Sequence, residues 1–252
     1  MNTKIEHDDL ILKDTNGKKI SCWSEWTRPK RDYQWTPGRS AMELAKAWFR
    51  DGHLSPPKEL FDLLSSHKRF QGLELIKGIP EKITNLPVKG EGRNHDLWLL
   101  GKTSDESVTI CIEAKADEPF GSDTIEVYLQ KARNRIKEEK PTGVPKRIKA
   151  LLKIVGGNLS KWGIIQYQLL TALSGTILQA KQDCSTLAVF IVHIFETNLT
   201  TPEKLEKNAY DYSRFLEVLG FNPDHCSDGN MYGPVTIDGV ECLIGKIVAR
   251  VP

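Results

Sequence analysis

The chain has 252 residues, of which 39% are hydrophobic and 27% are charged. This length suits one large domain, and the composition is that of a folded globular protein, so global disorder is excluded. The 35 basic and 33 acidic residues give a formal net charge of +2, which excludes a strongly basic protein but leaves room for a local basic cleft, all that a nuclease needs.

No segment of the sequence has the pattern of a signal peptide or a membrane span. The first ten residues, MNTKIEHDDL, lack an apolar stretch behind a basic start. The longest apolar stretches, such as Leu187 to Phe195, are too short to cross a bilayer. The five cysteines are scattered without a C-x-x-C pair, which favours free thiols in a reducing compartment over zinc or disulfides. We therefore expect a cytoplasmic protein with no membrane partner.

The first half of the chain contains an arm, two helices and three strands. Residues 1–38 are polar with scattered aromatics, and prolines break regular structure there. Ser40 suits a helix N-cap, and Glu43 stands three residues on, in the spacing of a capping box. A second short helix starts at Pro56–Pro57. Three strands are then predicted within 73–88, over 96–100 and over 108–116.

The second half combines helices with one strongly apolar strand. The segment Leu187 to Phe195, LAVFIVHIF, is almost wholly apolar, which predicts a central strand covered on both faces. Asp238-Gly239 is a hairpin turn signal for one or two edge strands in the tail. The predicted helices span residues 124–140, 147–155, 160–179 and 202–219, and the tail strands lie within 234–251.

This order of elements predicts an α/β protein whose mixed central sheet is flanked by helices. We expect one domain over residues 1–252, with its core at about 38–196. Residues 197–252 would add a C-terminal helix and strand extension.

The third strand carries the residues with chemical potential. With a period of two, Glu113 and Lys115 share one face, while the opposite face is apolar throughout. Asp96 begins the preceding strand and would reach the same end in a hairpin. Mg²⁺ takes oxygen ligands, usually one or two carboxylates plus water and phosphate oxygens. Asp96, Glu113 and the carbonyl of Ala114 could bind it, and Lys115 could orient water or offset charge on a phosphate.

The run GEGRNHDLWLLG, a polar turn and then VTICIEAKADEPFG resemble the PD-(D/E)XK phosphodiesterase superfamily. The resemblance covers roughly Gly38 to Glu196 and is closest to bacterial members with an IEAK motif followed by DEPFG. It implies a restriction-endonuclease-like α-β-β-β-α-β core, in which Asp96, Glu113 and Lys115 take the motif positions. Asn94-His95 replaces the proline of the motif name. The implied activity is that of an Mg²⁺- or Mn²⁺-dependent nuclease acting on DNA, in bacterial defence or DNA processing.

The resemblance also implies two further site residues. Members often add a carboxylate from the first helix, for which Glu43 is the candidate and Glu59 the rival; Glu43 could instead serve only as a capping residue. Members also often place a Gln, Lys or Arg on the helix after the third strand. Gln168 is favoured over Gln166 because it leads directly into an apolar packing side.

Several alternatives stay open at this point. The arm from Trp26 to Trp35 interleaves basic and aromatic residues, and could either contact nucleic acid or pack onto the domain. The basic run from Lys131 to Lys149 is either a DNA-facing rim or a solvated helix. The Glu113–Lys115 pair could be a surface ion pair on a half-exposed hairpin. The protein could also be a catalytically idle nucleic-acid-binding module or a protein-interaction scaffold, and a homodimer is not excluded.

Overall fold

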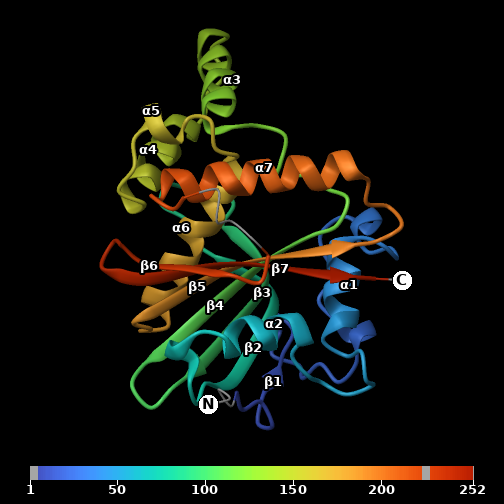
Figure 1. Ribbon diagram of the computed structural model, residues 1–252. Coiled ribbons are helices and arrows are strands. Elements are labelled where there is room, and N and C mark those ends of the chain that lie inside the picture. Colours follow the sequence, from blue (N-terminus) through green and yellow to red (C-terminus); the bar gives the residue numbers. More distant parts are fainter. Residues whose placement is uncertain (1–4, 223–227, 252) are drawn as a thin grey trace.

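The computed structural model describes residues 5–222 and 228–251. A seven-stranded mixed sheet crosses the molecule, with helices on both faces (Figure 1). From one edge to the other, the strands are β1 (Ile11–Leu12), β2 (Glu74–Thr84), β3 (Arg93–Lys102), β4 (Ser107–Lys115), β5 (Leu187–Glu196), β7 (Val240–Arg250) and β6 (Met231–Ile237).

Two hydrophobic layers enclose the sheet. Helices α1 (Ser40–Ala47) and α2 (Lys58–Ser65) bury their apolar sides against one face, where Leu44 and Leu60 are fully buried. Helices α6 (Tyr167–Gln182) and α7 (Pro202–Val218) cover the other face, where Leu173 and Phe215 are fully buried. The predicted α/β class, a mixed sheet flanked by helices, is confirmed.

Strand direction changes in the middle of the sheet. Strand β3 runs antiparallel to both of its neighbours, β2 and β4, as successive hairpins do. Strand β5 then runs parallel to β4, and α6 makes the crossover between them. All residues of β5 up to Phe195 are buried, which confirms the central strand predicted from its continuous apolar run.

The two faces of β4 differ as its sequence period predicts. Val108, Ile110 and Ile112 pack in the layer with α1 and α2. Glu113 faces the other way and reaches α6. However, every β4 residue after Ser107 is buried, so the alternative of a half-exposed hairpin with a surface ion pair is wrong.

The C-terminal tail forms the predicted hairpin around Asp238-Gly239 and gives one edge strand. Only β6 lies at the edge, whereas β7 pairs in parallel with β5 over ten residues, from Leu187 to Glu196. Strand β7 can occupy this inner position because its apolar residues serve both layers: Leu243 packs with α2, and Cys242 and Ile244 pack with the layer of α6 and α7.

The helix expected over residues 160–179 is two helices, α5 (Leu159–Trp162) and α6. The break has a local cause at Gly163, which closes α5; a Cβ there would lie 2.7 Å from the carbonyl oxygen of Leu159. The chain then pairs with the start of helix α3 (Ile125–Lys137), where the Ile125 amide donates to the Ile165 carbonyl over 2.9 Å. This turn puts Gln168 in the first turn of α6, instead of mid-helix.

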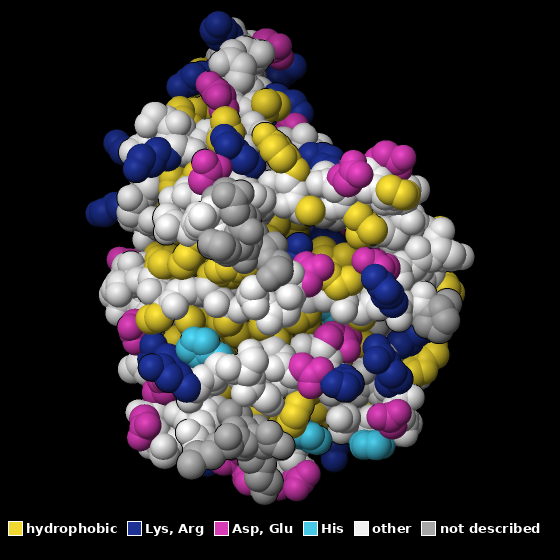
Figure 2. Space-filling view, in the orientation of Figure 1, with side chains coloured by type: hydrophobic (Ala, Val, Ile, Leu, Met, Phe, Trp, Pro, Cys, Tyr) yellow, Lys and Arg dark blue, Asp and Glu magenta, His cyan; other side chains and the backbone are white. Residues whose placement is uncertain are grey.

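Helices α3 (Ile125–Lys137) and α4 (Val144–Ile154) form a projection from the body (Figure 1). Figure 2 shows Lys and Arg side chains spread over this projecting part. Lys131 pairs with Asp123 over 2.6 Å, and Arg147 donates to the Val88 carbonyl over 3.4 Å.

Two further findings concern the expectations about cysteines and membranes. Cys22, Cys111, Cys184 and Cys242 are free thiols, and Cys226 lies outside the described residues. Among the helices of the described part, none combines the length and the apolar character that a bilayer span requires.

The C-terminal extension is part of the same core, which generates the first prediction. Phe215 of α7 is fully buried and meets Phe190 of β5 edge-on, with ring centroids 6.0 Å apart. Phe215→Ala should lower the free energy of unfolding by about 3–5 kcal/mol, and urea unfolding followed by circular dichroism should keep a single transition. A second transition, with the core unaffected, would show that α7 folds as a separate unit.

Candidate active site

A cavity of about 760 Å³ lies beside the ends of β3 and β4. Its lining brings together four of the residues singled out in the sequence, Asp96, Glu113, Lys115 and Gln168, and includes Ala114. They come from three elements that the chain order separates by up to 72 positions in sequence, from 96 to 168. The sheet register and the packing of α6 therefore assemble the site.

Glu113 is the centre of the cluster and is only 1% exposed. Its Oε1 accepts hydrogen bonds from Lys115 Nζ and Gln168 Nε2, each over 2.6 Å. Its Oε2 forms an ion pair with the guanidinium of Arg93. A carboxylate can be buried in this way only when charges and donors compensate it, and here both oxygens are compensated.

Asp96 lies beside Glu113 because of the register between β3 and β4. Leu97 pairs with Ile112, so Asp96 falls opposite Glu113. The Asp96 Oδ2 accepts a hydrogen bond from the Ala114 amide over 2.7 Å, which locks its side chain to the end of β4. Its Oδ1 accepts no hydrogen bond from the described residues and stays available to a ligand.

Burial shifts the pKa values of the charged groups in opposite directions. It raises the pKa of Asp96, although Lys115, Arg93 and the Ala114 amide partly offset this effect. It lowers the pKa of Lys115, which Asp96 and Glu118 oppose. The Lys115 ammonium also lies 5.6 Å from the centre of the Phe120 ring, which helps to hold it beside the carboxylates.

Two buried charged residues of the cavity were missed in the sequence. Arg93 belongs to β3, which begins three residues earlier than predicted, so it had fallen outside the predicted strands. Glu81 comes from β2 and has a left-handed φ of 56°. Its side chain accepts a hydrogen bond from Asn94. Arg93 was visible three residues before Asp96, whereas Glu81 carried no signal, because only the β2–β3 register brings it close.

Burial, with a further contribution from Asp96, raises the pKa of Glu81 to about 8. The cavity thus gathers carboxylates whose repulsion is not fully neutralised within the protein. Strained backbone at such a position is characteristic of functional sites. A cation bound there would relieve the repulsion.

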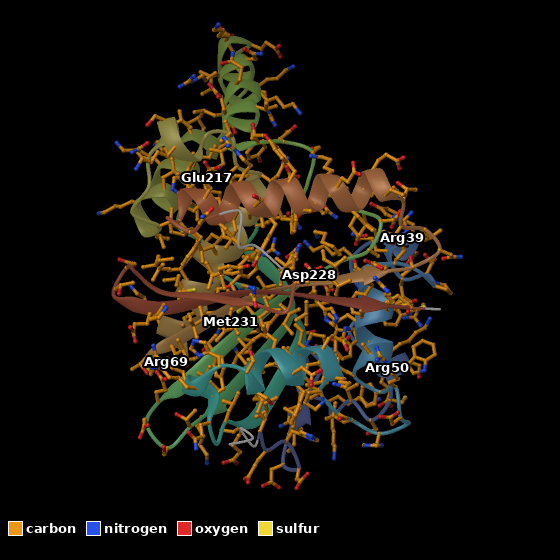
Figure 3. All side chains as sticks on the ribbon, viewed as in Figure 1. Arg39, Arg50, Arg69, Glu217, Asp228 and Met231 are labelled. Atoms are coloured by element: carbon orange, nitrogen blue, oxygen red, sulfur yellow. The ribbon has the colours of Figure 1, made fainter. Side chains whose placement is uncertain are left out.

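The loop after β4 ties the cavity to helices on both sides of the sheet. Asp117 pairs with Arg39, at the start of α1, over 2.9 Å and with Lys204 of α7 over 3.2 Å. Figure 3 shows Arg39 at this end of α1. Glu118 accepts hydrogen bonds from Ser40 and from the Ala116 amide. Asp117 and Glu118 of the DEPFG segment therefore form a clamp that holds the loop after β4 to α1 and α7.

The structure separates the two candidate glutamines. Gln168 contacts Glu113 directly, as favoured in the sequence. Gln166 instead precedes α6 and forms a β-bridge with Thr124.

The candidate glutamates Glu43 and Glu59 are not brought to the cavity. Ser40 is the first residue of α1 instead of its N-cap, so the expected capping box is absent. Glu43 accepts instead from the Gly38 amide over 2.8 Å and pairs with Lys46. Glu59 forms a hydrogen bond with His193, 3.1 Å away, on the face covered by α1 and α2. From α1, the cavity is lined only by residues of its first turn.

The N-terminal arm forms part of the wall of the cavity. Pro29, Lys30, Arg31 and Gln34 line it. Lys30 pairs over 3.1 Å with Glu91 in the β2–β3 loop, and both side chains are largely exposed. Trp26, by contrast, is 3% exposed and packs in the core. Trp26 therefore packs onto the domain, as one of the two interpretations expected, while residues that follow it line the cavity.

Residues 17–251 match a protein family described as a domain of unknown function, DUF6946. The chain belongs to this family. The matched range includes the arm, the cavity residues and the C-terminal extension, so the family domain contains the whole assembly described above. No curated protein and no solved structure matches the chain.

The raised pKa of Glu81 generates the second prediction. The folded protein retains a proton that the unfolded chain releases near its ordinary pKa of 4.5. The resulting stabilisation is fully present below about pH 4.5 and is lost as the pH rises through about 8. In metal-free buffer, we expect the Tm of Glu81→Gln to fall less between about pH 5 and pH 8 than that of the unsubstituted protein. Parallel Tm profiles in thermal unfolding by circular dichroism would contradict this assignment.

Proposed function

We propose that this protein is an Mg²⁺- or Mn²⁺-dependent nuclease of the PD-(D/E)XK type, hydrolysing phosphodiester bonds in DNA. The observation that carries the proposal is the joint position of Asp96, Glu113, Lys115 and Gln168 around one polar cavity. Two carboxylates, an ammonium and an amide in this arrangement suit metal-assisted hydrolysis of a phosphodiester.

The order of the elements supports the proposal. Helix α1 is followed, α2 aside, by three antiparallel strands, then by helices of which α6 is the last, and then by β5, which pairs in parallel with β4. This agrees with the α-β-β-β-α-β core that the sequence resemblance implies. The added strands β6 and β7 extend the sheet beyond β5.

The donor set fits Mg²⁺ or Mn²⁺. Asp96 Oδ1, a Glu113 oxygen and the Ala114 carbonyl would supply the protein ligands. Within the described part of the chain, no three His, Cys, Asp or Glu side chains form a ready-made metal cage. Mg²⁺ does not require one, because it takes most of its ligands from water and substrate phosphate. When bound, the ion would lower the pKa of a coordinated water and offset charge on the scissile phosphate.

The other residues would position these groups. Gln168 donates to Glu113 and limits the orientations of its carboxylate. Lys115, held between Glu113 and the Phe120 ring, can donate to the attacking water or to a phosphate oxygen. The lowered pKa of Lys115 makes proton exchange with that water easier than for an exposed lysine.

The arm supports a nucleic-acid substrate. Lys30 and Arg31 line the same cavity as the carboxylates and can contact phosphates of a bound strand. Tyr33 is 57% exposed beside Arg31, whose guanidinium carbon lies 6.0 Å from the centre of its ring. An exposed aromatic ring next to basic side chains is a suitable surface on which a base can stack.

One observation favours a second candidate function. Because Lys115 and Arg93 already compensate Glu113, the cluster is electrostatically satisfied without a metal. A catalytically idle nucleic-acid-binding or regulatory module of the same fold would keep this arrangement as an internal ion-pair network. Metal binding and cleavage separate the two candidates.

The third prediction concerns cleavage. With Mn²⁺ or Mg²⁺, the protein should cut plasmid, linear duplex or single-stranded DNA, and Lys115→Ala and Asp96→Asn should each lower the rate roughly 100-fold or more. Lys58→Ala and Asp62→Asn are matched controls, since these residues form an exposed ion pair on α2, and they should cut normally. Absence of both cleavage and Mn²⁺ binding by calorimetry would favour the idle module.

The fourth prediction concerns the arm. The double substitution Lys30→Gln and Arg31→Gln should weaken oligonucleotide binding in EDTA, measured by fluorescence anisotropy. The slope of log K against log salt should become less steep by about 1.4 for a single strand, because two phosphate contacts are lost. The double substitution Lys58→Gln and Lys68→Gln, on exposed residues away from the cavity, should change neither quantity. An unchanged slope in the arm variant would exclude the arm from the binding surface.

A further inference from the structure

Arg93 is the buried cation of the cavity whose role the proposed reaction leaves open. Its side chain is 10% exposed, and its guanidinium forms an ion pair with Glu113 Oε2. Lys115 contacts the other oxygen, Oε1. The nearby carboxylates of Asp96 and Glu81 also favour its charged form. Arg93 therefore puts positive charge among the same carboxylates that would bind a divalent cation.

The position of Arg93 is built into the fold. Gly175 lies in the middle of α6, where glycine is unfavourable for a helix. A Cβ at that position would lie 2.7 Å from Arg93 Cγ and 2.9 Å from Arg93 Cβ. These atoms belong to the inner part of the side chain and cannot move aside easily. The glycine thus makes room for the arginine stem between α6 and β3.

The guanidinium retains unused hydrogen-bonding capacity. Arg93 Nε is buried and has no acceptor among the described residues. A guanidinium presents five N–H donors in a fork that matches a phosphate in two parallel hydrogen bonds. An arginine that serves only to neutralise Glu113 would leave this fork largely idle.

We propose that Arg93 is the internal counter-ion of the metal-free site and that a divalent cation displaces it from Glu113, releasing the guanidinium to bind a substrate phosphate. The inference rests on the proposed function. Glu113 is too buried to be left without a compensating charge. Exchange of one cation for another keeps a positive charge beside Glu113 Oε2 throughout, whereas simple departure of Arg93 would leave only Lys115, on Oε1. The guanidinium moves and no covalent bond changes.

Mn²⁺ titration by calorimetry, on the full chain without nucleic acid, tests the exchange. Arg93→Gln should bind Mn²⁺ about tenfold tighter or more, the effect of removing a competing ion pair. Arg93→Lys keeps the charge and should lie between the two. Gly175→Ala keeps Arg93 itself but displaces its stem, so it should also bind Mn²⁺ more tightly. It provides an independent test if Arg93→Gln does not fold.

Oligonucleotide binding tests the second half of the proposal. A phosphorothioate-linked single strand resists hydrolysis and can be followed by anisotropy with and without Mn²⁺. Mn²⁺ should strengthen its binding to the unsubstituted protein about tenfold more than to Arg93→Gln. In EDTA the two proteins should bind alike, because Glu113 then holds the guanidinium.

The outcomes separate this inference from the proposed function. Mn²⁺ binding to the unsubstituted protein, with equal or weaker binding to Arg93→Gln and Gly175→Ala, would overturn the exchange and leave the nuclease proposal standing. Absence of Mn²⁺ binding in all the variants would overturn both. Tighter Mn²⁺ binding without the metal-dependent change in oligonucleotide affinity would reject the transfer of Arg93 to phosphate.

Discussion

The burial of Glu113 is the constraint on which the candidate site depends. A carboxylate this deeply enclosed needs compensating charges and hydrogen-bond donors. They come from β3, β4 and α6 as Arg93, Lys115 and Gln168. The pairing of β3 with β4 and the approach of α6 to the sheet must therefore be correct together. If any one of these elements shifted, a buried charge would lose its partner.

The apolar layers hold these elements in place. One face of β4 packs against α1 and α2, while β5 is buried among both layers. The clamp formed by Asp117 and Glu118 joins the end of β4 to the starts of α1 and α7. The polar cluster thus sits at the end of strands that cannot move independently, and a site on rigid elements can maintain the geometry that catalysis requires.

The cavity contains charges of both signs, and several of its charged groups have shifted pKa values. Asp96 and Glu81 have raised pKa values, whereas burial lowers that of Lys115. Each shift shows that a charged form is disfavoured by its surroundings. A divalent cation and a phosphate would bring opposite charges to these groups, so the proposed ligands complement the protein. The arm is joined to the β2–β3 loop by the ion pair of Lys30 with Glu91. Its residues line the cavity in which such a substrate would bind.

The sequence by itself determined the class of fold, the faces of β4, the central position of β5 and the meeting of Asp96, Glu113 and Lys115. These features depend on strand period and on a hairpin between neighbours in sequence, which are local properties. The tertiary structure alone decided the inner position of β7, the exclusion of Glu43 and Glu59 and the arrival of Arg93 and Glu81, and it brought Gln168, already favoured over Gln166, onto Glu113. These features depend on register and on the helix break at Gly163, and a single sequence carries no direct signal for contacts between distant segments.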